Sequence, residues 1–130
     1  FKKPLIDTQI ISLDNLLSSS ISLPLKTKRK TYTIVGSRSH MSKETQDFFN
    51  EKKQKYAEVK LIAVGSSLKL CMLAEGQADA YPRYAPTMEW DIGAGHAIAK
   101  YAGFSVTQYN KNDEVVYNKE NLLNPWFLVK

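Results

Sequence analysis

The sequence predicts an α/β fold in which a mostly parallel sheet is flanked by helices. From residue 31 onward, short segments rich in β-branched and aromatic residues alternate with segments of helical periodicity, and glycines close several of them. This alternation is typical of layered folds with a largely parallel sheet. The 130 residues are enough for one domain with a buried core. No apolar run approaches the about 18 residues of a membrane span.

The first half of the chain contains three expected strands and one helix. Residues 8–12 and 21–25 are short β-leaning pieces separated by a polar stretch with a serine run. Residues 31–35 predict a strand that ends at Gly36. Ser42 is expected to cap a helix. The apolar face of that helix is predicted from helical spacing to consist of Thr45, Phe48, Phe49 and Tyr56.

The second half repeats the alternation. The expected elements are a strand over 59–64, a short helix over 68–75 closed by Gly76, a strand over 80–83, a small-residue helix over 91–102 closed by Gly103, and late strands over 104–108 and 126–129. In parallel sheets, ligands bind beyond the carboxyl ends of the strands. His40, Ser66 and Arg83 all follow predicted strands, so we expect a site at this edge.

The distribution of charge argues against a nucleic-acid-binding protein, and the cysteine content argues against a disulfide-stabilised one. The net charge of +5 includes a basic run over residues 26–30. No aromatic residues interleave with this run as a strand-binding platform requires, so it predicts a solvated loop rather than a nucleic-acid site. Cys71 is the only cysteine and cannot form an internal disulfide. It is expected to be a buried core thiol, which fits a reducing compartment.

The most informative stretch places Asp91 directly after Trp90 at the start of the small-residue helix. A carboxylate is favoured there by unpaired backbone N–H groups and by the positive end of the helix dipole. Gly93 and Gly95 allow a ligand or another segment to approach the backbone closely. On these residues alone, an aspartate that only caps the helix remains the more common explanation.

Three motifs in order, Gly65-Ser66-Ser67-Leu68-Lys69, Tyr81-Pro82-Arg83 and Glu89-Trp90-Asp91, together resemble the C-terminal half of the inositol monophosphatase superfamily of metal-dependent phosphatases. Within it, they look most like the CysQ-type 3′(2′),5′-bisphosphate nucleotidases. The resemblance implies that residues 1–30 are the tail end of an N-terminal β-rich domain. It implies that residues 31–130 are a C-terminal α/β substrate-binding domain, half of the layered sugar-phosphatase fold.

The substrate contacts are expected from four residues besides Asp91. Ser66 lies in a turn that suits an anion, and Lys69, one helical turn on, faces the same ligand. Arg83 suits a phosphate bidentately, whereas a glutamate tends to occupy this place in inositol monophosphatases. His40 resembles a substrate-contacting histidine of the nucleotidases, although a surface histidine explains it equally well. His96 is expected to be structural.

Asp91 is the expected metal ligand and catalytic residue, because Mg²⁺ prefers oxygen ligands. The resemblance implies Mg²⁺-dependent conversion of adenosine 3′,5′-bisphosphate to AMP and phosphate. It also implies a role in sulfur assimilation, in the cytoplasm or peripherally at the inner membrane.

The family's Glu-Glu pair and Asp-Pro-Ile-Asp-Gly-Thr motif do not occur in this sequence. We therefore expect a C-terminal portion, inactive alone, whose partner is the missing N-terminal half. An inositol monophosphatase-type phosphatase and a non-catalytic phosphate- or nucleotide-binding domain are the alternatives.

Overall fold

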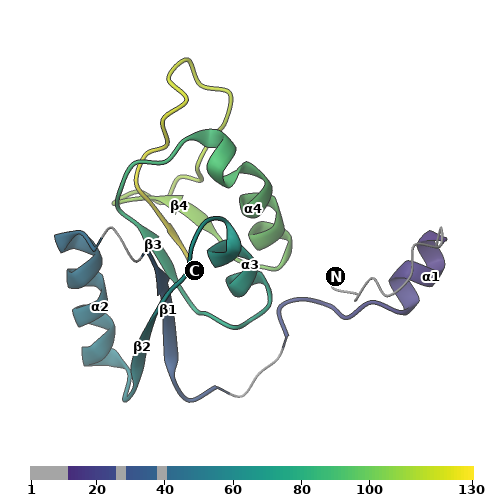
Figure 1. Cartoon of the computed structure of the whole chain (residues 1–130), viewed down its shortest axis with the longest axis horizontal. Helices are drawn as coiled ribbons and strands as arrows, with labels where there is room; N and C mark the ends of the chain where they lie inside the picture. The colour runs from purple at the N-terminus through teal and green to yellow at the C-terminus, as the bar shows by residue number, and fades with distance from the viewer. Residues whose placement is uncertain (1–11, 26–28, 38–40) are drawn as a thin grey trace.

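The computed structural model describes residues 12–25, 29–37 and 41–130. In these ranges it contains helices α1 (Leu13–Ser18), α2 (Lys43–Lys55), α3 (Leu68–Ala74) and α4 (Glu89–Tyr101), and strands β1 (Tyr32–Gly36), β2 (Val59–Ala63), β3 (Tyr81–Arg83), β4 (Val106–Gln108) and β5 (Phe127–Val129). Strands and helices alternate up to β4 (Figure 1). The predicted α/β class is confirmed. None of the helices in the described ranges is long and apolar enough to cross a membrane.

The strands form a two-stranded parallel sheet, β1-β2, and a three-stranded antiparallel sheet, β3-β5-β4. β1 pairs with β2 in parallel, and a parallel bridge between Ile34 and Ala80 joins β1 to the start of β3. β5 lies between β3 and β4 and runs antiparallel to both. Parallel and antiparallel pairings thus occur together, so the structure does not clearly show the expected mostly parallel sheet. The chain returns from β4 to β5 through a loop without a crossover helix, which favours antiparallel neighbours.

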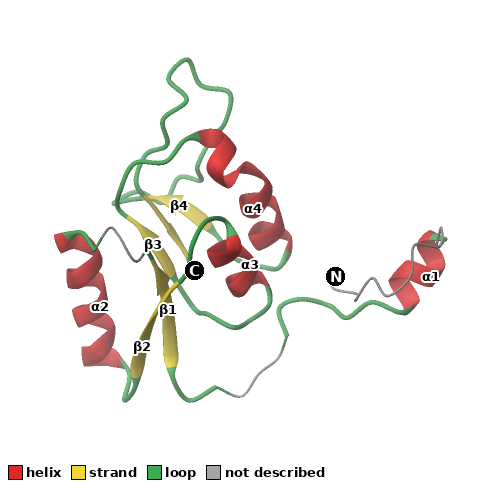
Figure 2. Cartoon of the chain, in the orientation of Figure 1, coloured by secondary structure: helices red, strands yellow, loops and turns green. Residues whose placement is uncertain are grey.

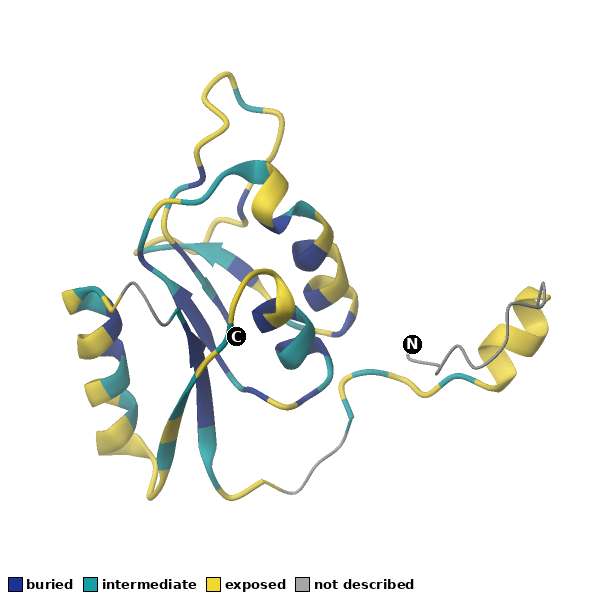
Figure 3. Cartoon of the chain, in the orientation of Figure 1, coloured by how far each residue is buried: buried dark blue, intermediate teal, exposed yellow. Residues whose placement is uncertain are grey.

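The sheet separates two apolar cores. α2 covers one face and the α3–α4 pair covers the other (Figure 2). Neighbouring β1 residues alternate between them, since Ile34 packs with Phe48 of α2 whereas Val35 joins the larger core beneath α3 and α4. Both side chains have no exposed surface, and the buried strands form the centre of the molecule (Figure 3). A strand covered on both faces is expected to be largely apolar, as Ile34 and Val35 of β1 are.

The α2 helix begins where the sequence predicts. The Ser42 side chain accepts a hydrogen bond from the Thr45 N–H at 3.2 Å, which confirms the predicted cap. Thr45 and Phe48 are buried and Phe49 is half-buried. Tyr56 follows the helix and is exposed, but its ring stacks on Tyr32 with centroids 4.2 Å apart.

The segment before β1 differs from the prediction. Residues 13–18 form α1, which buries none of its residues and lies apart from the layered body (Figure 1). Residues 21–25 are irregular rather than a strand, because Pro24 has no N–H to donate to a ladder. The other predicted piece, 8–12, is described only at its last residue. In the basic run, 26–28 lie outside the described residues, and Arg29 donates to the Asp79 carboxylate at 2.7 Å.

Cys71 lies on α3 as a free thiol and is half-buried, not fully buried as expected. It faces outward relative to its neighbours Leu70 and Leu73, which are buried in the larger core. A seven-residue helix buries only one stripe of side chains against the sheet, so one position of the apolar run is left near the surface.

The contact between α3 and α4 depends on Gly95. A Cβ at this position would lie 2.4 Å from Leu70 Cδ1 and 3.0 Å from Leu70 Cβ, so only glycine allows the two helices to approach this closely. Gly93, two residues earlier on the same helix, is different. A Cβ there would meet only Tyr117 Cε1, at an ordinary contact distance of 3.6 Å.

We expect the two glycines to respond oppositely to alanine. Gly93→Ala should raise the free energy of unfolding by up to about 1 kcal/mol, because alanine is the better helix former. Gly95→Ala should lower it by about 1–3 kcal/mol, because Leu70 must move. Urea unfolding followed by circular dichroism measures both, and equal stabilisation by the two variants would contradict the close α3–α4 contact.

Candidate functional site

A cleft of about 390 Å³ opens at the carboxyl ends of β1, β2 and β3. These three strands run in the same direction, so the residues that follow them meet at one edge of the sheet. The cleft is lined by Ser37, Ser66, Ser67, Lys69, Leu70, Tyr81, Arg83, Thr87, Trp90, Asp91 and Ile92. Four of the predicted site residues, Ser66, Lys69, Arg83 and Asp91, therefore line one cleft. The fifth, His40, lies outside the described residues.

The turn between β2 and α3 is held together by Lys69. Its ammonium donates to the carbonyl oxygens of Val64, at 3.0 Å, and Ser66, at 2.9 Å. Ser66 has a left-handed backbone (φ 52°), which is uncommon for a residue other than glycine. A Cβ at Gly65 would meet no atom within 4 Å, so the space beside the turn is open. Because an ammonium has three donors, Lys69 keeps one N–H for a ligand.

Burial makes Lys69 electrostatically unusual. Only 5% of the residue is exposed, and its ammonium lies 5.2 Å from the centroid of the Tyr81 ring. Burial, and after it the positive charge of Arg83, lower the pKa of Lys69. Burial likewise raises the pKa of Tyr81 to about 12, so this ring stays neutral. Two cations thus repel each other across the cleft, and a bound anion would relieve that repulsion.

Arg83 ends β3 and is incompletely paired. One terminal nitrogen, Nη2, donates to the Pro86 carbonyl at 2.8 Å. Its Nε is buried and has no hydrogen-bond partner among the described residues. A buried charged donor without a partner is costly, and a phosphate oxygen would satisfy it. Arg83 is therefore poised for an anionic ligand.

Asp91 is the third residue of α4, not its first as the sequence predicts. The cap residue is Met88, whose side chain offers no oxygen, and Asp91 Oδ2 accepts the Met88 N–H at 2.8 Å instead. Asp91 therefore does cap the helix, as the non-functional explanation expects, but this capping uses only one of its two carboxylate oxygens. Oδ1 accepts no hydrogen bond from the part of the chain that the structure describes, and Asp91 is exposed.

The residues present fit one position of a magnesium site. Mg²⁺ usually takes one or two carboxylates and completes its shell with water and phosphate. Asp91 offers one such oxygen in the cleft that Lys69 and Arg83 also line. Within the described ranges, no cluster of three or more histidine, cysteine or acidic residues is arranged to hold a metal. The Asp79 carboxylate is already engaged, because it accepts hydrogen bonds from the Arg29 guanidinium and from the Thr33 N–H.

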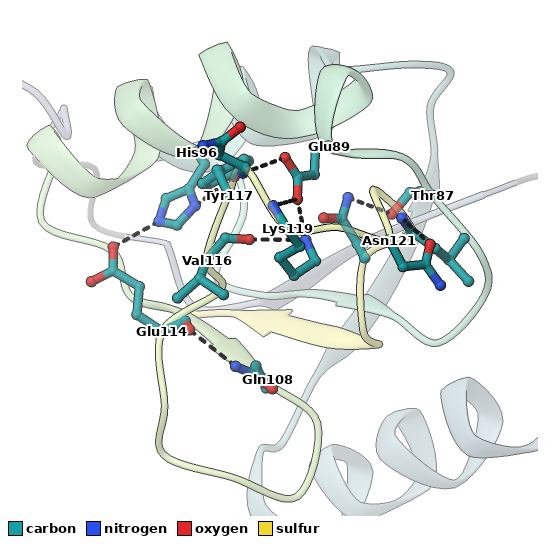
Figure 4. Close-up of polar contacts among 12 residues, drawn as sticks. Thr87, Glu89, His96, Gln108, Glu114, Val116, Tyr117, Lys119 and Asn121 are labelled. Atoms are coloured by element: carbon teal, nitrogen blue, oxygen red, sulfur yellow. Dashed lines mark hydrogen bonds and ion pairs between the residues drawn. The ribbon is translucent and has the colours of Figure 1, made fainter.

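One face of α4 is fastened to the loop between β4 and β5, residues 109–126, which we call the C-terminal loop. Near the helix start, the Glu89 carboxylate accepts the N–H groups of Asn118, at 2.7 Å, and Lys119, at 3.2 Å. The Lys119 ammonium forms an ion pair with the same carboxylate (Figure 4). The hydrogen bond from Lys119, more than any other contact, lowers the pKa of Glu89.

His96 lies two helical turns further along the same face. Its Nδ1 is 2.7 Å from the Tyr117 hydroxyl and its Nε2 is 3.0 Å from Glu114 Oε1 (Figure 4). Lys100 donates to both oxygens of Glu114. The structural role expected for His96 agrees with these contacts. Its partners were not visible in the sequence because Tyr117 lies 21 residues away, in a loop without periodicity.

A larger groove of about 630 Å³ lies beside α2, over the uncovered part of β4 and β5. Its charged walls carry both signs, and Glu51 is already paired with Lys52 and Lys55. It gathers no convergent set of donors, so it indicates no ligand class. The smaller cleft is the better candidate for chemistry.

Comparison with known proteins gives matches to one family and to named relatives. The sequence model of the inositol monophosphatase family matches residues 14–126. A 96-residue stretch, 74% of the chain, is 45% identical to the 3′(2′),5′-bisphosphate nucleotidase CysQ of Salmonella typhimurium and covers 37% of that protein. The CysQ of Escherichia coli K12 is 42% identical over the same length and share. The chain thus spans well under half the length of these curated relatives.

The fold is similar to that of solved structures. A crystal structure of CysQ from Bacteroides thetaiotaomicron, a bacterial member of the inositol monophosphatase family, superposes with a TM-score of 0.84 at 47% identity. The match covers 96% of this chain and 46% of that one. Inositol monophosphatase II from Staphylococcus aureus superposes over 85% of the chain and 40% of its own, with a TM-score of 0.59. At 16% identity, this second likeness concerns the fold alone.

The buried histidine predicts a pH effect on stability. Burial lowers the pKa of His96, against the opposing effect of Glu114. The unfolded chain therefore binds a proton before the folded one does, so this stability is present above about pH 6.5 and is lost as the pH falls toward the folded pKa. The loss is at most about 1.4 kcal/mol per pH unit.

Urea unfolding at pH 7 and pH 5, compared between the wild type and His96→Gln, measures this contribution. The variant should lose less stability between the two pH values. An identical loss in both proteins would show that His96 does not titrate differently in the folded state.

Proposed function

Because the chain belongs to the inositol monophosphatase family, we propose that it is the C-terminal portion of a Mg²⁺-dependent 3′(2′),5′-bisphosphate nucleotidase. The complete enzyme, a phosphoric monoester hydrolase, converts adenosine 3′,5′-bisphosphate to AMP and phosphate. In this proposal residues 31–130 form the substrate-binding domain, and residues 1–30 belong to the end of the preceding domain. The similarity to CysQ proteins supports the substrate class.

The observation that carries the proposal is the pair of cations in the cleft. Lys69 and Arg83 face the same space, and each retains an N–H without a partner in the described structure. A ligand with two phosphate groups matches two separate cationic donors better than a singly phosphorylated polyol does. Hydroxyl-bearing residues complete the lining and offer further donors.

The chain's own residues divide the work of binding and orientation. Lys69 and Arg83 bind phosphate oxygens, and the Ser66 turn presents backbone and hydroxyl donors beside them. Asp91 is oriented by the bond from Met88 to Oδ2, which leaves Oδ1 to hold the metal. When bound, Mg²⁺ would neutralise charge on the transferring phosphoryl group and lower the pKa of a water molecule. His40 remains a proposed substrate contact.

Two alternatives are separated by specific features. Against an inositol monophosphatase-type phosphatase stands Arg83, since that group tends to carry a glutamate in its place. The composition of the cleft favours the second alternative, a non-catalytic phosphate- or nucleotide-binding domain. Among the described residues that line the cleft, Asp91 is the one acidic residue. Only a partner that brings further carboxylates would complete a metal site.

The proposed partner is the N-terminal half of the same protein. The sides of α3 and α4 turned away from the sheet expose large apolar side chains, at Leu68 (59%), Trp90 (68%), Ile98 (47%) and Tyr101 (91%). Large apolar side chains exposed in this number on two neighbouring helices are consistent with a surface that another segment covers. The proposal extends to a cytoplasmic enzyme of sulfur assimilation that acts on a small nucleotide and not on nucleic acid.

Asp91→Asn in the complete protein should abolish phosphate release without unfolding it. The amide keeps the oxygen that caps α4 but removes the charge that a metal ligand needs. Phosphate release from adenosine 3′,5′-bisphosphate and the melting temperature measure the two effects. Asp113→Asn, an exposed carboxylate of the C-terminal loop, is the matched control and should stay active. An active Asp91→Asn enzyme would falsify the metal role.

Arg83→Glu should shift preference from bisphosphorylated nucleotides toward singly phosphorylated polyols. Loss of a charge-assisted contact costs about 1.5–3 kcal/mol, or roughly ten- to hundredfold in kcat/KM. Arg83→Lys, which keeps the charge but loses the fork and Nε, should fall between. Comparison of kcat/KM for adenosine 3′,5′-bisphosphate and inositol monophosphate tests this, and unchanged ratios in both variants would contradict the assignment.

A further inference from the structure

We propose that Glu89 and Lys119 are positioning residues for Asp91. Their ion pair fastens the first turn of α4 to the C-terminal loop and thereby fixes the direction of the carboxylate that faces the cleft. The inference rests on the proposed function, because it needs Asp91 to be a metal ligand. It concerns a different part of the molecule, since neither Glu89 nor Lys119 lines the cleft.

The start of α4 needs support from outside because its cap residue is Met88. A helix begins with unpaired N–H groups, which a serine, threonine or aspartate cap usually satisfies. Here the Glu89 N–H donates to the Leu122 carbonyl of the C-terminal loop at 3.0 Å. Met88 itself forms a β-bridge with Leu123 of the same loop. Both residues that precede Trp90-Asp91 are thus tied to one short stretch of chain.

The Glu89 side chain makes the strongest of these ties. Only 11% of the side chain is exposed, and it accepts two consecutive backbone N–H groups together with the Lys119 ammonium. Asn118 has a left-handed backbone (φ 61°), and this turn directs its own N–H and that of Lys119 toward the carboxylate. The Lys119 ammonium also donates to the Val116 carbonyl at 3.0 Å, so the loop turn is closed around the ion pair.

The geometry of the helix transmits this tie to Asp91. Two residues along an α-helix correspond to a rotation of about 200°, so Glu89 and Asp91 point to opposite sides of the first turn. Glu89 faces the loop (Figure 4) and Asp91 faces the cleft. If the first turn rotates or frays, the Asp91 carboxylate moves directly, because its own described tether is the N–H of neighbouring Met88.

The same helix face offers a matched control near its other end. Lys100 pairs with Glu114 at 2.6 Å, so α4 and the C-terminal loop share a second ion pair in the helix's last turn. Removing this pair weakens the attachment of the loop but leaves the first turn tied through Glu89. If both ion pairs are merely structural, removing either one should have similar effects. If Glu89 and Lys119 position Asp91, only the removal of their pair should weaken Mg²⁺ binding.

The experiment uses the complete protein and Mg²⁺ alone as the probe. Glu89→Ala, Glu89→Gln, Lys119→Met and Lys100→Met are compared by titration calorimetry with Mg²⁺, by melting temperature, and by kcat and KM for adenosine 3′,5′-bisphosphate. Glu89→Ala and Lys119→Met should weaken Mg²⁺ binding by roughly ten- to hundredfold. They should lower kcat more than they change KM. Glu89→Gln should be milder because its amide oxygen can still accept one of the two N–H groups, which bond to different oxygens of Glu89.

Lys100→Met should lower the melting temperature to a similar extent as Lys119→Met while keeping the Mg²⁺ affinity of the wild type. Equal losses of Mg²⁺ affinity in these two variants, or wild-type affinity in Glu89→Ala, would overturn the positioning role. Asp91→Asn separates the two proposals. If it binds Mg²⁺ as the wild type does, the proposed function fails and the inference with it; if it loses Mg²⁺ while Glu89→Ala does not, only the inference fails.

Discussion

The parallel alignment of β1 with its two neighbours is the constraint on which the rest of the structure depends. β1 is buried on both faces, so its position in the sheet is fixed by two cores at once. Its pairing with β2 and its bridge to the start of β3 bring three carboxyl ends to one edge. Ser66 and Arg83 reach the cleft because their strands end there, and a reversal of either strand would carry its residue to the far edge of the sheet.

The cleft holds unfavourable electrostatics that a ligand would relieve. Lys69 and Arg83 carry like charges, and burial lowers the pKa of the lysine as well. The left-handed Ser66 and the unpartnered Nε of Arg83 add local strain and an unmade hydrogen bond. The surroundings are closely packed, since β1 is buried on both faces and Gly95 brings α3 and α4 together. Such an arrangement favours an anion over a neutral ligand before any specific contact is considered.

The sequence predicted those features that depend on local patterns. Helix and strand periodicity, the Ser42 cap, and the stops at Gly76 and Gly103, both with left-handed backbones, need only neighbouring residues. The insertion of β5 between β3 and β4 was missed because strand order depends on contacts across the chain. The ties from α4 to the C-terminal loop were missed for the same reason. Glu89 and His96 find their partners 18 to 30 residues away, in a segment with no periodicity.

The different faces of α4 explain how one short helix serves both packing and chemistry. Gly95 brings it against α3, and Glu89 and His96 fasten it to the C-terminal loop, so the helix is held on two sides by this chain alone. Asp91 lies one turn before Gly95, on the side of the helix opposite Glu89, and one of its oxygens is engaged by Met88. A carboxylate oriented in this way can offer one oxygen to a cation without first losing conformational freedom. Because it offers only one, the remaining ligands of the proposed metal must come from substrate, water and, in the proposed complete enzyme, its N-terminal half.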